Sequence, residues 1–431
     1  MAVVSLLLSR ETTPISDTMC FRTWNDLIIS LPNKTVKWCC KTIETPQQRK
    51  DTTFDLNILE TQGLNFLLNH PVVTNRKSEL STGIQCTDCS DCWESEAESG
   101  ASTRTISSRD NKFLMDQNLD ITKDLVQYIE IELTNKCNMA CNYCWEGLST
   151  RWQKETGIRF PDTDDAIFDK VLELLNQYWE QTLKDKEIIT FSILGGEPFF
   201  TNHMYKFIEE FIVNINDTAR ESQQIILTVT TNSNFPKHKY NKFIELVKRT
   251  PNIRYEMQIS GEALGKKSEL IRWGLDFNKW DRNVDLFFEQ SQQIPNLILG
   301  FAPAHNSLSL PYFKDFLVYL NEKISKFNYS DEILMHHNWV QQPDWMSLLA
   351  LDPKHAEAVQ EQIDYLDLMP GIFGNGGKRR YITILKSMKA IVEAEVSKER
   401  RQEANKQFKI LEKRRKISFS EHFPHYHELI E

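Results

Sequence analysis

Three cysteines that lie close together are the residues of this chain with the most evident chemistry. Cys137, Cys141 and Cys144 follow a Cys-x3-Cys-x2-Cys spacing, which places three thiols on one short loop. A [4Fe–4S] cube is normally held by four thiolates, one for each iron. Three thiolates on one loop leave one iron open to another ligand, and an open coordination position is typical of a reactive metal site.

Zinc is the alternative metal that the same three cysteines could bind. Structural zinc sites usually have four Cys or His ligands, often as paired Cys-x2-Cys sets. No second set lies near Cys137, Cys141 and Cys144 in the sequence. The spacing therefore favours an iron–sulfur cluster.

A second motif, Gly195-Gly196-Glu197-Pro198, directly follows an apolar run at residues 188–194 that predicts a strand. Two glycines allow a backbone to approach a ligand closely. The carboxylate of Glu197 can accept a charge-assisted hydrogen bond from an ammonium group. A simple turn with a solvated carboxylate is the alternative, but the position at a strand end favours a ligand site.

Together these motifs resemble the signature of the radical S-adenosylmethionine (radical SAM) superfamily. In that family, three cysteines hold a [4Fe–4S] cluster, and the amine and carboxylate of S-adenosylmethionine bind the fourth iron. Reductive cleavage then yields a 5′-deoxyadenosyl radical, which abstracts hydrogen from a substrate. The resemblance implies that Cys137, Cys141 and Cys144 are the catalytic cluster ligands.

The resemblance also implies contacts to S-adenosylmethionine along the strand ends of the domain. An aromatic residue would lie near the adenine, the glycine motif at the methionyl amine, and polar residues at the ribose or carboxylate. The residues at these positions are Tyr143 for the adenine, Gly195, Gly196, Glu197 and Pro198 for the amine motif, Asn232 and Ser260 for the ribose or carboxylate, and Arg272 for the carboxylate.

A second group of cysteines lies upstream, at Cys20, Cys39, Cys40, Cys86, Cys89 and Cys92. This region resembles the auxiliary-cluster module called a twitch domain, a shortened relative of the SPASM domain. Here the module precedes the catalytic region, as in radical SAM proteins from phage and marine bacterial genomes. The match extends to residues 98–104 and 411–429.

The resemblance implies an auxiliary [4Fe–4S] cluster in this upstream module. The favoured ligand set is Cys20, one of Cys39 or Cys40, Cys89 and Cys92. Adjacent cysteines in an extended chain point in opposite directions, so only one of Cys39 and Cys40 is expected to bind. Cys86 is the alternative to Cys89, or a spare. A structural zinc held by four of the six remains the competing interpretation.

The composition of the chain excludes several classes of protein. The chain has 431 residues, 40% of them hydrophobic, and a net charge of −9, which argues against non-specific nucleic-acid binding. No apolar run approaches the roughly 20 residues of a membrane span, and no signal peptide is recognised. We expect a cytoplasmic protein without disulfides, reduced by a low-potential donor such as flavodoxin or ferredoxin.

Strand and helix patterns alternate through the middle of the chain. Strands are predicted at residues 128–133, 188–194, 225–231, 254–259, 297–301 and 332–339, and helices between them at 165–183, 204–215 and 239–248. Such alternation predicts a parallel α/β sheet. Six units fall short of the eight in a full TIM barrel, and the resemblance implies a partial (β/α)6 barrel.

This gives a five-part organisation. It has a flexible N-terminus (1–18), a twitch-like module (19–95) with a predicted hairpin at 26–38, a linker (96–122), the barrel (123–345) and a helical C-terminal region (346–431).

The first functional hypothesis is a radical SAM enzyme acting on a peptide or protein. The second is one acting on a small metabolite or nucleotide, and the third is a non-catalytic, zinc-stabilised binding protein. No cysteine follows Cys144, so a downstream thiol cannot donate hydrogen.

Overall fold

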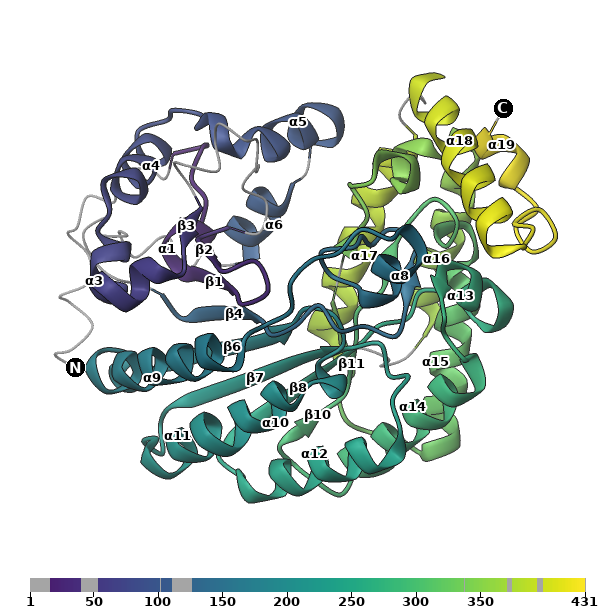
Figure 1. The fold of residues 1–431 in the computed structure, drawn as a ribbon. Helices are drawn as coiled ribbons and strands as arrows, with labels where there is room; N and C mark the ends of the chain where they lie inside the picture. The colour runs from purple at the N-terminus through teal and green to yellow at the C-terminus, as the bar shows by residue number, and fades with distance from the viewer. Residues whose placement is uncertain are drawn as a thin grey trace, which may run out of the picture. The chain divides into compact units, whose positions relative to one another are not determined.

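The computed structural model describes residues 16–39, 53–100, 102–110, 126–336, 338–369, 374–393 and 398–430. The chain divides into two units (Figure 1). Unit 1 contains Met1–Ile29 and Lys34–Ile129, and unit 2 contains Ser30–Asn33 and Glu130–Glu431. Cys40 and most of the predicted flexible N-terminus lie outside the described residues.

Unit 1 combines short strands with several helices. The predicted hairpin forms between β1 and β2, and its turn contains Lys34 in a left-handed conformation (φ 54°). β2 pairs with β3 in antiparallel fashion. The elements are α1 (Arg22–Asn25), β1 (Asp26–Ser30), β2 (Thr35–Lys37), β3 (Phe54–Asp55), α3 (Asn57–Leu68), α4 (Pro71–Ser81), α5 (Ser90–Ser99) and α6 (Thr103–Asp110).

The described part of the segment expected to be a linker, up to residue 110, is helical, and residues 111–122 lie outside the described residues. Residues 96–110 form the end of α5 and all of α6, apart from the short connection between them. Arg104 of α6 donates to the backbone oxygens of Asp17 and Met19 at 2.8 Å each, and it pairs with Glu96 at 2.5 Å. The segment is polar, so its sequence shows no hydrophobic face. Its place in unit 1 comes from these hydrogen bonds instead.

Unit 2 contains a mostly parallel sheet whose strands follow one another in chain order. β6 pairs in parallel with β7, β7 with β8, β8 with β10 and β11, and β11 with β13. The strands are β4 (Tyr128–Glu132), β6 (Ile188–Leu194), β7 (Gln224–Thr231), β8 (Ile253–Ile259), β10 (Leu297–Ile298), β11 (Gly300–Phe301) and β13 (Leu334–Met335).

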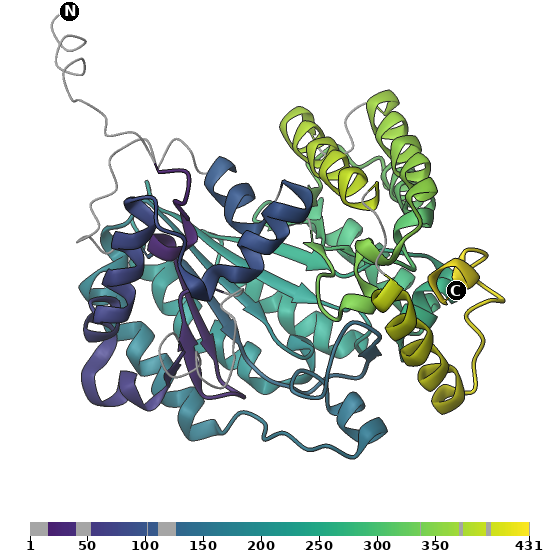
Figure 2. The same ribbon diagram turned by 90° about the horizontal axis from the view of Figure 1, so that it is seen from above.

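Helices connect these strands and cover one face of the sheet. Parallel strands in sequential order with right-handed crossovers place their helices on the same side, and Figures 1 and 2 show this arrangement. The predicted helix at 204–215 contains a π-helical turn at Ile208–Ile212. The helices are α9 (Asp165–Gln181), α10 (Asn202–Phe207), α11 (Val213–Thr218), α12 (Lys237–Arg249), α14 (Phe277–Ser291) and α15 (Phe313–Phe327).

The core of unit 2 follows from residue alternation. In β8, every second side chain is buried, starting with Ile253 and ending with Ile259. In β7, Leu227 and Val229 are fully buried, and Phe191 and Ile193 of β6 lie beside them. The structure therefore confirms the predicted α/β class with a central parallel sheet.

The last part of the chain is helical, as the sequence predicted. It contains α16 (Ala356–Leu368), α17 (Gly374–Val392), α18 (Lys398–Arg415) and α19 (Tyr426–Ile430). α18 is highly charged, but Ala404, Phe408, Leu411 and Arg415 are buried. These positions recur at helical spacing and define a single inward face. The inward face ends at an arginine.

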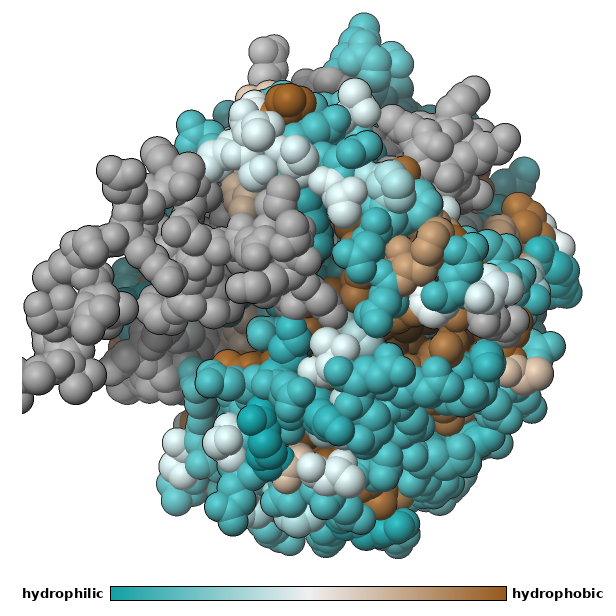
Figure 3. Space-filling model, turned by 90° about the vertical axis from the view of Figure 1, so that its left-hand side faces the viewer, coloured by the Kyte–Doolittle hydropathy of each residue, from teal (hydrophilic) through white to brown (hydrophobic). Residues whose placement is uncertain are grey.

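Among the described residues, no helix is long and apolar enough to cross a membrane. Where described residues are visible in Figure 3, the surface is mainly hydrophilic, with scattered hydrophobic side chains. Single exposed hydrophobic residues of this kind are usual on protein surfaces.

Candidate metal centres and ligand site

The cysteine loop lies just after β4 and is held in place by a short strand pair. β5 (Ala140–Cys141) pairs in antiparallel fashion with β9 (Arg272–Trp273), so that Cys141 lies opposite Arg272. Cys137, Cys141 and Cys144 are free thiols, of which Cys141 is buried. One loop therefore carries all three predicted cluster ligands.

Burial makes all three thiols hard to ionise. It raises the pKa of Cys144 to about 12, and Cys141 nearby adds to this effect. It also raises the pKa of Cys137 well above its usual value. At Cys141, burial raises the pKa while the guanidinium groups of Arg272 and Arg415 oppose the rise. Because a metal binds the thiolate form, metal binding would displace these protons.

Five consecutive backbone carbonyls of the loop, from Cys137 to Cys141, each accept a side-chain hydrogen bond. Four donors come from Ser149 and the first turn of α8 (Thr150–Thr156), and the fifth comes from α18. In loop order, the donors are Thr150 Oγ1 at 3.1 Å, Arg151 Nη1 at 3.1 Å, Ser149 Oγ at 2.5 Å, Arg415 Nη2 at 2.9 Å and Trp152 Nε1 at 2.9 Å. The loop shape is therefore set by the protein itself.

The glycine motif packs against the residues that precede the cysteines. Gly195 (φ 86°) and Gly196 (φ 54°) both adopt left-handed conformations. A Cβ atom on Gly196 would lie 2.5 Å from the carbonyl oxygen of Lys136. The N–H of Glu197 donates to the same oxygen at 2.8 Å. The sequence predicted that the glycines approach a ligand closely, but in the structure they approach the chain's own backbone.

Glu197 is fully buried at the meeting point of two strand ends. Its carboxylate accepts hydrogen bonds from the Thr231 hydroxyl (2.8 Å), the Asn232 N–H (2.6 Å) and the Phe199 N–H (3.2 Å). Burial raises the pKa of Glu197 to about 7, although these hydrogen bonds oppose the rise. The carboxylate therefore ties the end of β6 to the end of β7.

The rest of the glycine motif is placed as follows. Pro198, also buried, begins a short 3-10 turn, Pro198–Phe200. Gly195 and Gly196 remain partly exposed, unlike Glu197. The backbone of the two glycines is therefore the part of the motif that a ligand can reach most easily.

Asn232 also reaches the cysteine loop. Its side-chain nitrogen donates to Asn138 Oδ1 at 2.8 Å and lies 3.9 Å from the sulfur of Cys137. Ser260, at the end of β8, is half-buried, and its N–H donates to the Thr231 carbonyl at 2.8 Å. The structure thus brings Asn232 to the cysteines, and leaves Ser260 one strand further along the sheet.

Arg272 has a buried partner that sequence analysis missed. Its guanidinium pairs with Glu262 through contacts of 2.5 and 3.0 Å, and the Tyr143 hydroxyl donates to Glu262 at 3.1 Å. Although burial works against the charge, Glu262 raises the pKa of Arg272 above its usual value. Glu262 follows Ser260 and Gly261 just after a strand, and that position was the available signal.

Unit 1 brings most of its cysteines together. One small cavity is lined by Cys20, Cys39, Cys89 and Cys92, together with Arg22, Thr23, Arg76, Asp88, Thr103 and Arg104. Burial, and then Cys89 and Cys92, raise the pKa of Cys20 to about 12. The four lining cysteines are the favoured sequence set, with Cys39 as the member of its pair that the structure describes.

Cys86 lies beside this cavity rather than among its lining residues. Its sulfur, the Cys89 sulfur and a carboxylate oxygen of Asp88 lie within 4.8 Å of one another. The hydrogen bond between the two thiols, followed by burial, raises the pKa of Cys89. Asp88 also forms an ion pair with Arg76. A fifth cysteine is therefore close enough to compete for a metal.

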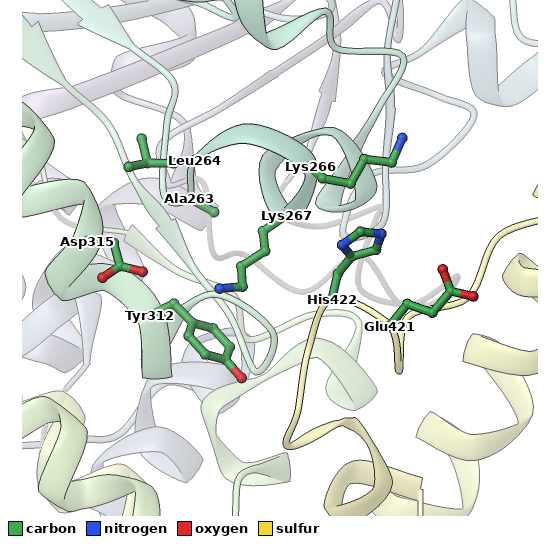
Figure 4. Close-up of a pocket in the computed structure, with 8 residues that line it drawn as sticks. All are labelled: Ala263, Leu264, Lys266, Lys267, Tyr312, Asp315, Glu421 and His422. Atoms are coloured by element: carbon green, nitrogen blue, oxygen red, sulfur yellow. The ribbon is translucent and has the colours of Figure 1, made fainter.

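A further cavity of about 310 Å³ lies elsewhere in unit 2 (Figure 4). The Nζ of Lys267 lies 3.9 Å from the ring centroid of Tyr312 in this cavity. Its lining residues are Ala263, Leu264, Lys266, Lys267, Tyr312, Asp315, Glu421 and His422. None of them is a predicted site residue, so this cavity is not the predicted cluster site.

Comparison with known proteins gives three results. Residues 130–263 match the family model described as a 4Fe-4S single cluster domain. No curated protein matches the chain. Among solved structures, a histidine-tagged form of anSMEcpe with bound AdoMet is similar at 17% identity and a TM-score of 0.39, covering 56% of this chain and 59% of that one.

Two further solved structures are similar to the same extent. Native anSMEcpe with bound AdoMet shows 15% identity and a TM-score of 0.40, covering 56% of this chain and 60% of that one. Native anSMEcpe with bound AdoMet and Kp18Cys peptide shows 17% identity and a TM-score of 0.39, covering 56% and 59%. The likeness thus spans less than two thirds of each solved chain.

The family match includes the three closely spaced cysteines, the glycine motif and Asn232. It agrees with the prediction of a [4Fe–4S] cofactor in this part of the chain. Residues 130–263 are the segment of this protein that matches a 4Fe-4S single cluster domain.

Proposed function

We propose that this protein is a radical SAM enzyme with its catalytic cluster on Cys137, Cys141 and Cys144. The observation that carries the proposal is the cysteine loop. It offers three free thiols, and its backbone carbonyls accept hydrogen bonds from side chains outside the loop. When bound, the reduced cluster would supply the electron that cleaves S-adenosylmethionine and starts hydrogen abstraction. The match to a 4Fe-4S single cluster domain supports this assignment.

The residues around the loop fit a ligand with an ammonium group. Burial leaves Glu197 with a pKa of about 7, so a nearby cation would favour its ionised form. We assign the ammonium to the backbone carbonyls of Gly195 and Gly196, two residues that are partly exposed, with the buried Glu197 holding their turn. Pro198 fixes the start of the next turn.

The remaining predicted contacts are assigned to the rest of the ligand. Asn232, next to Cys137, would orient the ribose or carboxylate, and Ser260 would lie further along the strand ends. Tyr143 would form the adenine side of the site. Because Arg272 is already paired with Glu262, we assign it to the wall that fixes Tyr143.

We further propose that the parallel sheet of unit 2 is a partial (β/α)6 barrel, and that unit 1 is the twitch-like module. Sequential strand order with helices on one face supports the first part. The cysteine-lined cavity of unit 1 supports the second. An auxiliary [4Fe–4S] cluster would be held there by Cys20, Cys39, Cys89 and Cys92.

Zinc is the second candidate for unit 1. The close grouping of Cys86, Asp88 and Cys89 favours it, because zinc accepts a mixed set of sulfur and carboxylate ligands. The four cysteines that line one cavity favour the cluster over a mixed set of ligands, because a [4Fe–4S] cube takes four thiolates. We therefore retain the auxiliary cluster as the proposal.

A peptide or protein is the proposed substrate class, and a small metabolite or nucleotide is the alternative. The support for a peptide is the auxiliary module, which accompanies peptide modification in the family that the sequence resembles. We propose a low-potential donor such as flavodoxin or ferredoxin, and a cytoplasmic location.

The test is an anaerobic assay of 5′-deoxyadenosine formation by reconstituted protein with S-adenosylmethionine and a strong reductant. We expect Cys137→Ala, Cys141→Ala and Cys144→Ala each to abolish product, because each removes a cluster ligand. Cys92→Ala serves as the matched control, since it removes a thiol from unit 1 and should leave uncoupled cleavage partly intact. Product formation by the Cys141→Ala variant would contradict the proposal.

A further inference from the structure

Arg415, the last residue of α18, reaches the middle of the cysteine loop from far along the chain. One guanidinium nitrogen donates to the Ala140 carbonyl at 2.9 Å, and another donates to the Asn142 side chain at 2.6 Å. Its Nε donates to Glu155 at 3.1 Å. Arg415 therefore forms hydrogen bonds with the residues on both sides of Cys141.

The same guanidinium lies close to two indole rings, both from residues that bond to the loop. Its central carbon is 4.9 Å from the ring centroid of Trp152 and 5.3 Å from that of Trp273. Trp152 donates to the Cys141 carbonyl, and Trp273 pairs with Ala140 across the short strand pair. Only 1% of the Arg415 side chain is exposed. Removing it would therefore leave a buried carbonyl and a buried amide oxygen without their donor.

Burial of a charged guanidinium is costly unless the group is paired and hydrogen-bonded, and Arg415 meets both conditions. A cation near Cys141 opposes the negative charge that a thiolate brings. Charges and hydrogen bonds around a cluster also adjust its reduction potential. Arg415 is thus placed to affect both the shape and the charge of the loop.

We propose that Arg415 is a positioning residue, through which the C-terminal helix α18 locks the cysteine loop and places a positive charge beside Cys141. The shape part of this inference concerns the protein alone. The charge part rests on the proposed function, since it requires a cluster on the three thiols.

Lysine can supply the charge of this role but not the hydrogen bonds that hold the loop. The guanidinium is planar, donates in several directions at once and stacks on aromatic faces, whereas an ammonium is a point charge. Arg415→Lys should keep the charge and lose the fork, and Arg415→Met should lose both. Lys413→Met, an exposed position in the same helix, is the matched control for the loss of one charge.

The first measurement is hydrogen–deuterium exchange of residues 137–144 in the metal-free, full-length protein. We expect the loop amides to exchange at least about tenfold faster in both Arg415 variants, since each loses donors to the loop. In Lys413→Met we expect the exchange rate of the loop to be unchanged. Peptides from β7 serve as the internal folding control. If the loop of Arg415→Met exchanges like that of Lys413→Met, Arg415 does not position the loop.

The second measurement is the reduction potential of the cluster that reconstitutes on unit 2, followed by electron paramagnetic resonance. Arg415→Met should shift the potential downward and Arg415→Lys should restore it, because the charge is kept. An unchanged potential in Arg415→Met would overturn the charge part. If no cluster forms on unit 2 even in the unsubstituted protein, the proposed function and the charge part fail, while the exchange result still decides the shape part.

Discussion

At the scale of single residues, the sequence predicts which side chains lie near the cysteine loop but not which partners the buried charges have. The spacing of Cys137, Cys141 and Cys144 predicts one loop, and the structure places them on one loop. Glu197 lies beside that loop, as expected, but its carboxylate binds three donors from its own chain. Glu262 was missed because its partner, Arg272, is fixed by tertiary packing rather than by local spacing.

The raised pKa of Glu197 makes stability depend on pH. Burial raises its pKa from 4.5 to about 7, so the folded protein holds this proton more tightly than the unfolded chain. The carboxyl group therefore contributes less stability as the pH rises from about 4.5 to about 7, and its contribution is constant above that range. Glu197→Gln cannot lose a proton and should lack this pH-dependent loss.

We expect the melting temperature of Glu197→Gln, relative to the unsubstituted protein, to increase as the pH rises from 5 to 7 and then to level off. Thermal unfolding of both proteins without metal, measured at several pH values, tests this expectation. Glu210→Gln, on an exposed position of unit 2, is the matched control. A difference that stays constant with pH would mean that Glu197 has an ordinary pKa.

At the scale of elements, periodicity predicts the long strands and helices well and the short ones poorly. β6 has the predicted bounds, Ile188–Leu194, and β7 and β8 each begin one residue before the prediction. The predicted strand at 297–301 is split into β10 and β11. Short strands are set by their neighbours, so their own sequence carries little signal.

The helices of unit 1 show the same limit. No helix was predicted there from the sequence, and the structure has α1, α3, α4, α5 and α6. α4 begins with Pro71 after His70, a recognisable start signal, but it is polar overall and has little amphipathic pattern. Its fully buried Leu80 packs into the cluster of hydrophobic residues around Cys20 and Cys86. Packing of this kind is tertiary and cannot be read from one helix alone.

The turn that the glycine motif forms directly after β6 offers a test at this scale. Gly196→Ala would add strain from its positive φ and a clash with the Lys136 carbonyl at 2.5 Å. Gly157→Ala, at φ 81° in open space, adds only the strain, about 1–2 kcal/mol. We expect Gly196→Ala to lower the melting temperature clearly more than Gly157→Ala does. Equal losses would show that the turn moves away from residues 134–136 easily.

At the scale of the whole molecule, the chain holds its cysteines in two separate units. Eight of its nine cysteines lie in the described residues, four of them lining the unit 1 cavity and three on the unit 2 loop. The resemblance implied a favoured ligand set in unit 1, whereas the spacing of the cysteines alone did not choose between Cys86 and Cys89. That choice depends on how helices bring Cys20, Cys89 and Cys92 together, which spacing does not specify.

This separation predicts how metal content responds to substitution. The reconstituted protein should bind about eight irons, as two four-iron clusters require. The combined variant Cys137→Ala, Cys141→Ala and Cys144→Ala should retain about four, and Cys20→Ala with Cys92→Ala should also retain about four. Because each unit has its own cysteines, all five changes together should remove the iron.

Elemental analysis of zinc and iron in the same samples decides between the two interpretations of unit 1. A structural zinc would replace the auxiliary cluster if three results are found together. The unsubstituted protein would contain about four irons, and the variant without Cys137, Cys141 and Cys144 would contain none. Zinc would be present, and it would be lost in the variant that carries Cys20→Ala and Cys92→Ala. Cys86→Ala is the informative companion, because Cys86 lies beside Cys89 and Asp88 but does not line the cavity. Loss of metal in Cys86→Ala would move the unit 1 site from the cavity to that group.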